Sequence, residues 1–293
     1  MKAWKIGDVA ITRILEADLM GLLSHVLPDA TPEALWPMRW LFPHFVDEAG
    51  VLRGFTQAFV VQTPTRRIIV DTCIGNDKNF DPYRPSWSRM QTTFLNDLIA
   101  AGFPPASIDT VLCTHMHADH IGWNTMLVDG KWVPTFRNAR YLFNRIEYEA
   151  EQKRNNDPAR NDLRSQALRN AARESIAPVF DAGLAELVET EHRVCDEVRL
   201  MPTLGHTAGH VSVHIASRGE EAIISGDFIH HPCQLAHPEW AAYVDYDPAQ
   251  STATRQRVFA QLAGTPTLLI GSHFAEPVAG RIVRDGAAYR LDF

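Results

Sequence analysis

Three histidines and an aspartate lie within six consecutive positions of the segment VLCTHMHADHIGW, residues 111–123. They follow a short apolar run, and they are His115, His117, Asp119 and His120. In an extended chain alternate side chains point the same way, so three of these donors would share a side, and a turn after His117 would bring the fourth round. Neutral imidazoles and a carboxylate are the ligands that borderline divalent metals prefer. The alternative, a polar loop whose histidines cap the next helix, explains a lone histidine better than four donors.

A second group of histidines lies in LGHTAGHVSVH, residues 204–214. His206 stands between two glycines, in a tight loop where the backbone can approach a ligand closely. We therefore take His206 as the ligand, with His210 as its competitor. His214 belongs to the strand that follows, which favours a structural role.

The elements that carry these donors repeat along the chain. In the first half the segment RRIIVD ends in Asp71 and TVLCTH ends in His115; in the second half EAIISGD ends in Asp227 and TLLIGSH ends in His273. A helix is expected between the two strands of each half. Strand ends of this kind meet at one edge of a sheet, where ligands gather. Two mixed sheets with helices on both outer faces would bury the apolar strands of both halves.

The remaining elements follow from periodicity and turn residues. Strands are expected at 55–61, 67–70, 198–201, 211–215, 222–225 and 267–270, with a closing hairpin at 281–291. Helices are expected at 89–101 and from Asp247, as N-cap, to Gly264, and residues 145–190 read as a helical excursion.

Composition narrows the class of protein. The chain has 293 residues, of which 45% are hydrophobic, so it is long and apolar enough to bury a sizeable core. The net charge is −7 and no Lys/Arg run stands out, which argues against nucleic acid as a partner. Neither a signal segment nor a long apolar span is visible, so a cytoplasmic protein without a membrane partner is expected. The four cysteines lack the spacing of a thiolate zinc site.

Four ordered motifs resemble the metallo-β-lactamase superfamily: H-x-H-x-D-H at 115–120, G-H-T-x-G-H at 205–210, S-G-D at 225–227 and G-S-H at 271–273. The resemblance implies an α/β fold, the αββα four-layer sandwich. It also implies one domain over 1–293, with an N-terminal aromatic segment (about 20–50) and the helical excursion (about 145–190). The chain looks most like the branch of N-acyl-homoserine lactonases, pyridoxolactonase and methyl parathion hydrolase.

Carried over residue by residue, the resemblance implies two divalent metal ions and a hydroxide that bridges them. Zn²⁺ is the first choice, with Mn, Co or Fe as alternatives. The first metal would be held by His115, His117 and His206, the second by Asp119, His120 and His273, and Asp227 would bridge them. Histidine stands where β-lactamases often have cysteine, so antibiotic hydrolysis is not expected.

Asp119 is the expected proton shuttle to the leaving group. Lactonases often carry a tyrosine three residues after the bridging aspartate, and this chain has His230 there. We expect the substrate's reacting oxygen to be held either by a hydrogen bond from His230 or by a metal. The alternative interpretation of His230 is a surface histidine without a role in the reaction. Asp71 is read either as an acceptor for a ligand histidine or as a simple strand-end cap.

The expected substrate is a small, neutral, partly apolar lactone or carboxylic ester. Aromatic residues from Trp36 to Phe45 form a pocket wall or lid, or else a core or dimer contact. Five further apolar side chains neighbour the ligands in sequence and are candidates to line the same cleft, namely Trp123, Phe143, Phe228, Ile229 and Phe274. Alternatives are a phosphotriester hydrolase, a glyoxalase II-type thioesterase and, ranked lower, an iron-dependent persulfide dioxygenase. A homodimer is a further expectation.

Overall fold

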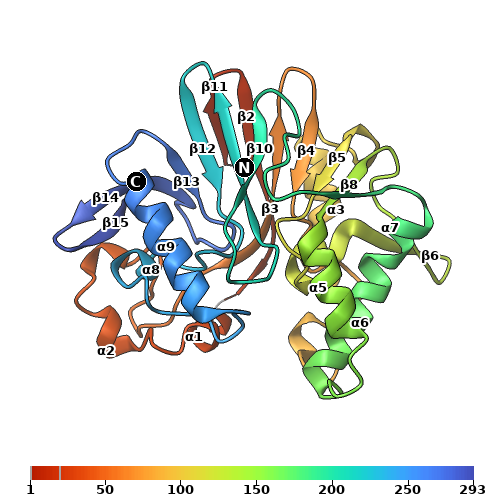
Figure 1. Cartoon of the computed structure of the whole chain (residues 1–293), viewed down its shortest axis with the longest axis horizontal. Coiled ribbons are helices and arrows are strands. Elements are labelled where there is room, and N and C mark those ends of the chain that lie inside the picture. Colours follow the sequence, from red (N-terminus) through yellow and green to blue (C-terminus); the bar gives the residue numbers. More distant parts are fainter. Residues whose placement is uncertain (1, 20) are drawn as a thin grey trace. The chain divides into compact units, whose positions relative to one another are not determined.

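The computed structural model describes residues 2–19 and 21–293, so Met1 and Met20, the latter at the start of the expected aromatic segment, lie outside it. The chain forms two compact units. The first unit comprises Met1–Glu16 and Gln57–Glu189, and the second comprises Ala17–Thr56 and Thr190–Phe293. Each unit is built on a mixed sheet accompanied by helices (Figure 1).

The first unit is built on a seven-stranded sheet in the order β1-β2-β3-β4-β5-β8-β9. Its four last strands run parallel to one another, while β3 and β4 form the expected antiparallel hairpin. The strands are β1 (Ala3–Ile6), β2 (Val9–Asp18), β3 (Phe55–Gln62), β4 (Arg67–Val70), β5 (Thr110–Leu112), β8 (Arg140–Asn144) and β9 (Ala185–Val188). A separate hairpin pairs β6 (Thr125–Val128) with β7 (Lys131–Pro134).

The helices of the first unit are α3 (Phe94–Ala100), α4 (Ala118–Ile121), α5 (Arg145–Asn155), α6 (Leu163–Ser175) and α7 (Ala177–Asp181). The last three fill the expected helical excursion (about 145–190) as far as Asp181, but its end was predicted wrongly, because Ala185–Val188 forms strand β9 of the sheet. The helix expected at 89–101 begins only at Phe94, so its first turn was predicted wrongly. Arg89 has a φ of 53°, and the backbone N–H of Thr92 donates to Asn76 Oδ1. These residues therefore form a loop folded back on the chain.

The second unit is built on a six-stranded sheet in the order β10-β11-β12-β13-β14-β15. Its strands are β10 (Val198–Pro202), β11 (Val211–Ser217), β12 (Glu220–Ile224), β13 (Leu268–Ile270), β14 (Ala279–Asp285) and β15 (Ala288–Asp292). The helices are α1 (Leu22–Val26), α2 (Pro32–Leu35), α8 (Cys233–Ala236) and α9 (Pro248–Leu262). As expected, α9 begins at the Asp247 cap, whose side chain accepts a hydrogen bond from the N–H of Gln250 at 3.0 Å.

The repeat seen in the sequence is present in the sheets. In the first unit β4 and β5 are parallel neighbours with Val70 opposite Leu112. In the second unit β12 and β13 are parallel neighbours with Ile224 opposite Ile270. Since parallel strands end at the same edge, Asp71 and the His115 loop emerge together, and Asp227 emerges beside the His273 loop.

The aromatic segment is divided between core and surface of the second unit. It contains the short helix α2 and the 3₁₀ turn Arg39–Leu41 rather than one helix, as expected from its prolines. Phe45 is fully buried, whereas Trp36 is 41% exposed and stacks on Phe42 with ring centroids 5.1 Å apart. Within residues 2–19 and 21–293, no helix is long and apolar enough to cross a membrane.

Candidate metal centre

The four donors of the first unit lie on the loop after β5 and on the single-turn helix α4. His117 is the residue before α4, and Asp119 and His120 lie within it, so the predicted turn is present. The ring centroid of His115 lies 4.6 Å from that of His117 and 4.1 Å from that of His120. The structure therefore gathers all three imidazoles of the first motif.

Asp71 is an acceptor for a ligand histidine and also closes the loop. One carboxylate oxygen lies 2.8 Å from His120 Nδ1, and the other accepts the N–H of Thr114 at 2.8 Å. The Thr114 hydroxyl donates to the same carboxylate at 2.9 Å. The proton of His120 is therefore held on Nδ1, which leaves the lone pair on Nε2, the nitrogen that could bind a metal.

Glu16, near the end of β2, supports the same loop and was not found from the sequence. It accepts hydrogen bonds from the N–H of Ile74 at 2.7 Å, from the N–H of Gly75 at 3.0 Å and from Trp123 Nε1 at 2.7 Å. Burial raises the pKa of Glu16 to about 7, against the opposing effect of these three donors. A lone glutamate in a strand gives no sequence signal for such contacts.

In the second unit, His206 lies in a tightly packed loop between β10 and β11. Gly205 has a φ of 125°, and a Cβ there would lie 2.2 Å from the backbone nitrogen of Ser251, so only glycine fits. His206 Nδ1 lies 2.8 Å from Asp245 Oδ1, a partner that the sequence analysis missed. Burial is the largest single effect and raises the pKa of Asp245, but the hydrogen bond with His206 and the charges of His206, His230 and Arg255 together bring it below its usual value, so the carboxylate stays ionised.

His210, the competitor of His206, has a positioning role instead. Its Nε2 accepts the backbone N–H of Asp227 at 2.7 Å, and its Nδ1 lies 3.0 Å from the carbonyl oxygen of Thr203. One neutral tautomer satisfies both contacts. His210 therefore fixes the backbone of Asp227, which supports the choice of His206 as the ligand.

Three imidazoles of the second unit point their Nε2 atoms at the carboxylate of Asp227. His206 and His230 lie 3.5 and 3.3 Å from Oδ2, and His273 lies 3.2 Å from Oδ1. The Nδ1 of His206 faces the Asp245 carboxylate, and that of His273 donates to the carbonyl oxygen of Phe55 at 2.9 Å. When His206 and His273 are neutral with the proton on Nδ1, their Nε2 lone pairs face an anion, which is repulsive unless a cation lies between them. This donor set fits a divalent metal.

His230 is buried, with only 3% of its surface exposed, so the interpretation as a surface histidine was wrong. It lies between β12 and α8, in a turn that Gln234 Oε1 closes by accepting the N–H of His230 at 2.8 Å. Burial lowers the pKa of His230, although the nearby carboxylate of Asp227 opposes this effect. The ring is therefore favoured in its neutral form.

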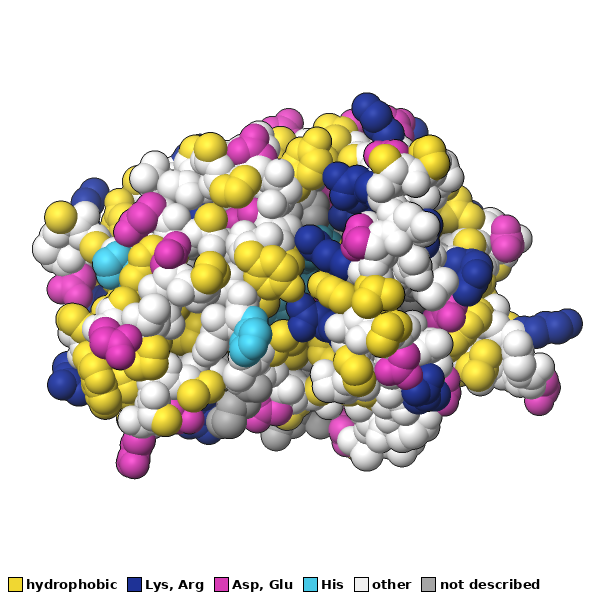
Figure 2. Space-filling model, turned by 90° about the horizontal axis from the view of Figure 1, so that it is seen from below, with side chains coloured by type: hydrophobic (Ala, Val, Ile, Leu, Met, Phe, Trp, Pro, Cys, Tyr) yellow, Lys and Arg dark blue, Asp and Glu magenta, His cyan; other side chains and the backbone are white. Residues whose placement is uncertain are grey.

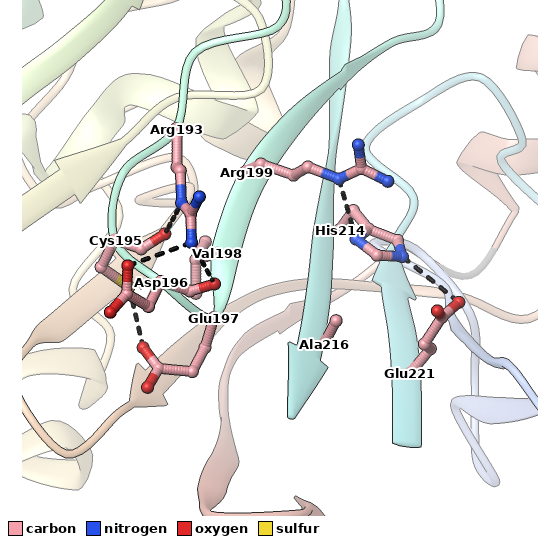
Figure 3. Close-up of a pocket in the computed structure, with 9 residues that line it drawn as sticks. All are labelled: Arg193, Cys195, Asp196, Glu197, Val198, Arg199, His214, Ala216 and Glu221. Carbon is pink, nitrogen blue, oxygen red and sulfur yellow. Dashed lines mark hydrogen bonds and ion pairs between the residues drawn. The ribbon is translucent and has the colours of Figure 1, made fainter. Parts of the chain in front are cut away.

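His214 lies in β11, at a surface pocket of about 330 Å³ that contains none of the predicted ligands (Figure 3). Its Nδ1 accepts a hydrogen bond from Arg199 Nε at 3.2 Å, and its Nε2 faces Glu221 Oε2 at 3.4 Å. Both ring nitrogens are thus engaged between neighbouring strands. The predicted structural role of His214 is confirmed.

The five apolar neighbours of the ligand motifs belong to the cores of their units. Trp123, Phe143, Phe228, Ile229 and Phe274 are each at most 4% exposed. Trp123 stacks on Phe94 with ring centroids 5.6 Å apart while donating to Glu16. The suggestion that they line a cleft was wrong, because closeness in sequence to a ligand does not fix which face of the element a side chain occupies.

Comparison with known proteins identifies the family. The hydrolase AbOPH of the beta-lactamase superfamily is 23% identical with a TM-score of 0.77, covering 99% of this chain and 95% of that chain. AidC, a dizinc quorum-quenching lactonase, is 21% identical with a TM-score of 0.76, covering 99% and 96%. No curated protein sequence matches significantly. The two structures show the shared fold, and the sequence profile of the metallo-beta-lactamase superfamily matches residues 51–273. The chain therefore belongs to the metallo-beta-lactamase superfamily.

Proposed function

We propose that the protein is a metal-dependent hydrolase of a neutral, partly apolar lactone or carboxylic ester. The observation that carries the proposal is the set of imidazoles directed at Asp227, in a chain of this superfamily. Two divalent metal ions are proposed, with Zn²⁺ as the first choice and Mn, Co or Fe as alternatives.

The seven predicted ligands are proposed to hold these ions. His115, His117 and His206 would hold the first ion, Asp119, His120 and His273 the second, and Asp227 both. Asp71 and Asp245 support this assignment, because each holds a proton on the Nδ1 of one ligand histidine. The single working domain would then be the whole chain, 1–293.

When bound, the ions would supply a water activated as a nucleophile near neutral pH and would polarise the substrate's carbonyl oxygen. Asp119 lies in the first turn of α4 with its side chain 16% exposed, so it can exchange protons with substrate and solvent. We assign it the transfer of a proton to the leaving group. His230 is the second residue proposed to serve the reaction, either by a hydrogen bond to the substrate's reacting oxygen or through a metal.

The substrate's apolar portion is proposed to pack on the aromatic segment. Trp36, Trp40 and Phe42 all keep part of their surface exposed, unlike the core residue Phe45. The net charge of −7 disfavours polyanions, and on the face in Figure 2 acidic and basic side chains are interspersed with apolar ones. We therefore propose a small-molecule substrate, without nucleic acid or membrane as partner, for a cytoplasmic enzyme that forms a homodimer.

Metal analysis combined with a substrate screen tests the proposal. Mildly purified protein should contain about two equivalents of divalent metal, and Asp227→Ala should lose metal and activity together. The screen compares lactones, aryl esters, thioesters and phosphotriesters, a choice that reflects AidC as a lactonase. Preference for thioesters or phosphotriesters would replace the proposed substrate class. A folded protein holding a single iron would favour a persulfide dioxygenase instead.

A further inference from the structure

We infer that His230 is itself a metal ligand, which binds through Nε2 the ion shared by His206 and Asp227. The inference rests on the proposed function, since it adds a donor to that centre. It goes beyond the seven donors that the family's motifs supply, because lactonases often carry a tyrosine at this position. The second unit would then offer three donors to this ion, His206, Asp227 and His230, in addition to His115 and His117, which are proposed for the same ion.

The two adjacent buried histidines, His230 and His231, differ in their hydrogen bonds. His231 uses both ring nitrogens: Nε2 donates to the carbonyl oxygen of Phe45 at 2.8 Å, and Nδ1 accepts the N–H of Cys233 at 3.1 Å. Among the described residues, neither ring nitrogen of His230 has a hydrogen-bond partner. Leaving a buried polar side chain unsatisfied is costly, so such a ring calls for a partner of another kind.

The distances between imidazole nitrogens and carboxylate oxygens also bear on the role of His230. The two buried imidazole–carboxylate hydrogen bonds, His120 with Asp71 and His206 with Asp245, are both 2.8 Å long. The more exposed pairs are longer, 3.0 Å for His237 with Glu239 and 3.4 Å for His214 with Glu221. His230 Nε2 lies 3.3 Å from Asp227 Oδ2, and His206 Nε2 lies 3.5 Å from the same oxygen. Two ligands of a tetrahedral zinc ion, each about 2.05 Å from the metal, are about 3.4 Å apart. The spacing of these buried groups thus fits donors around an ion.

The fold holds the imidazole ring of His230 in place. Gln234 accepts the backbone N–H of His230 through Oε1 and donates through Nε2 to the carbonyl oxygen of Trp240 at 2.7 Å. The imidazole of His230 is nearly parallel to that of His273, with centroids 6.1 Å apart, and meets His206 edge-on at 4.8 Å. His230 therefore lies close to both imidazoles of the second unit that the resemblance assigns to metals.

A ligand at this position changes how residue 230 serves the reaction. A tyrosine can donate a hydrogen bond directly to the substrate's oxygen. An imidazole bound to the metal instead acts through the ion, by adding electron density to it and by occupying one of its coordination positions. We therefore expect residue 230 to tune metal affinity as well as turnover.

Cobalt substitution tests this without relying on activity. Metal-free protein is loaded with Co²⁺, and the exchangeable ring N–H signals shifted by the paramagnetic ion are counted by proton NMR. The wild type should show one such signal more than His230→Gln. Chelator competition with Zn²⁺ should show about tenfold or greater loss of affinity for one ion in His230→Gln. The control variants His231→Gln and His214→Gln, which alter engaged structural histidines, should match the wild type in both measurements.

An unchanged signal count and an unchanged zinc affinity in folded His230→Gln would overturn the inference while leaving the hydrolase proposal intact. Failure of the wild type to bind any divalent metal would instead overturn the proposed function. Should His230→Gln not fold, the zinc-loaded wild type with ¹⁵N-labelled histidine decides the matter, since the Nε2 of His230 must show the shift of a metal-bound nitrogen. A His230 Nε2 shift unaffected by zinc would refute the assignment.

Discussion

The carboxylates near the predicted ligands differ in their contacts and in their exposure to solvent. Asp71 and Asp245 each face the Nδ1 of a proposed ligand histidine at 2.8 Å, and the side chains of both are buried. Asp119 is part-exposed at the first turn of α4, where its oxygen lies 3.8 Å from His120 Nε2. Orientation of ligands and movement of protons are thereby assigned to separate residues.

Replacing Asp119 by asparagine keeps its shape but removes the proton acceptor. We expect kcat for alkyl esters or lactones to fall about 10²-fold or more. For aryl esters, whose leaving groups depart without a proton, the fall should be smaller. Steady-state kinetics on a matched series of leaving groups measures the difference. An equal loss throughout the series would restrict Asp119 to holding metal.

Removing the carboxylate of Asp71 should loosen metal binding without removing a ligand. Asp71→Ala leaves the Nδ1 of His120 without its acceptor, so zinc affinity should fall about 10- to 100-fold. Asp71→Asn, which retains an acceptor oxygen, should lie between this variant and the wild type. Chelator competition measures the affinities, with thermal unfolding of the metal-free forms as a check on folding. Identical affinities would make Asp71 a loop cap only.

At the scale of elements, close backbone contacts place the loops. A Cβ on Gly122 would lie 1.8 Å from the carbonyl oxygen of Ile74, so the turn after α4 sits directly on the loop after β4. Glu16 then joins that loop to Trp123. The sequence predicted the strands and the donors they carry, because apolar runs and motifs are local. It could not predict Glu16 or Asp245, because their partners lie 58 and 39 positions away along the chain.

Lys78 joins three elements of the first unit and should make its stability depend on pH. Its Nζ donates to Thr125 Oγ1 at 2.7 Å and lies 3.5 Å from the ring centroid of Trp132 in the β6–β7 hairpin, and also 3.5 Å from the carbonyl oxygen of Glu174 in α6. Burial lowers the pKa of Lys78 from 10.5 to about 7, although Glu174 and Asp77 oppose this effect. Between these values the unfolded chain binds the proton and the folded chain does not.

The free energy of unfolding should therefore rise with pH through that window, by up to about 1.4 kcal/mol per unit from this group. Lys78→Met removes the titrating amine and fills the same space. Relative to this variant, the wild type should lose free energy of unfolding as the pH falls from about 10 to 7. Below pH 7 the difference in free energy of unfolding between the two proteins should stay constant. Urea unfolding of both proteins at several pH values measures it. A gap independent of pH would show that the amine stays charged when folded.

At the scale of the whole molecule, duplication of one β-α-β pattern accounts for the architecture. Asp71 with His115 and Asp227 with His273 are repeated features, and the parallel pairs β4–β5 and β12–β13 confirm the repeat. The substrate-contacting residues were harder to predict, because an aromatic residue near a motif serves the core as readily as a pocket. Trp123 and Phe274 proved to be core, whereas Trp36 and Phe42 kept exposed rings.

That difference gives a test of substrate class. If the exposed aromatic rings hold an apolar acyl or alcohol chain, each added methylene should contribute up to about 0.8 kcal/mol, or about fourfold in kcat/KM, until the rings are covered. Trp40→Ala or Phe42→Ala should flatten this rise while leaving turnover of the smallest ester nearly unchanged. Leu127→Ala, which trims an exposed side chain in the β6–β7 hairpin, should keep the wild-type slope. Preference for short, charged or nucleotide substrates would refute the apolar contact, since the proposed chemistry would then proceed without help from the aromatic segment.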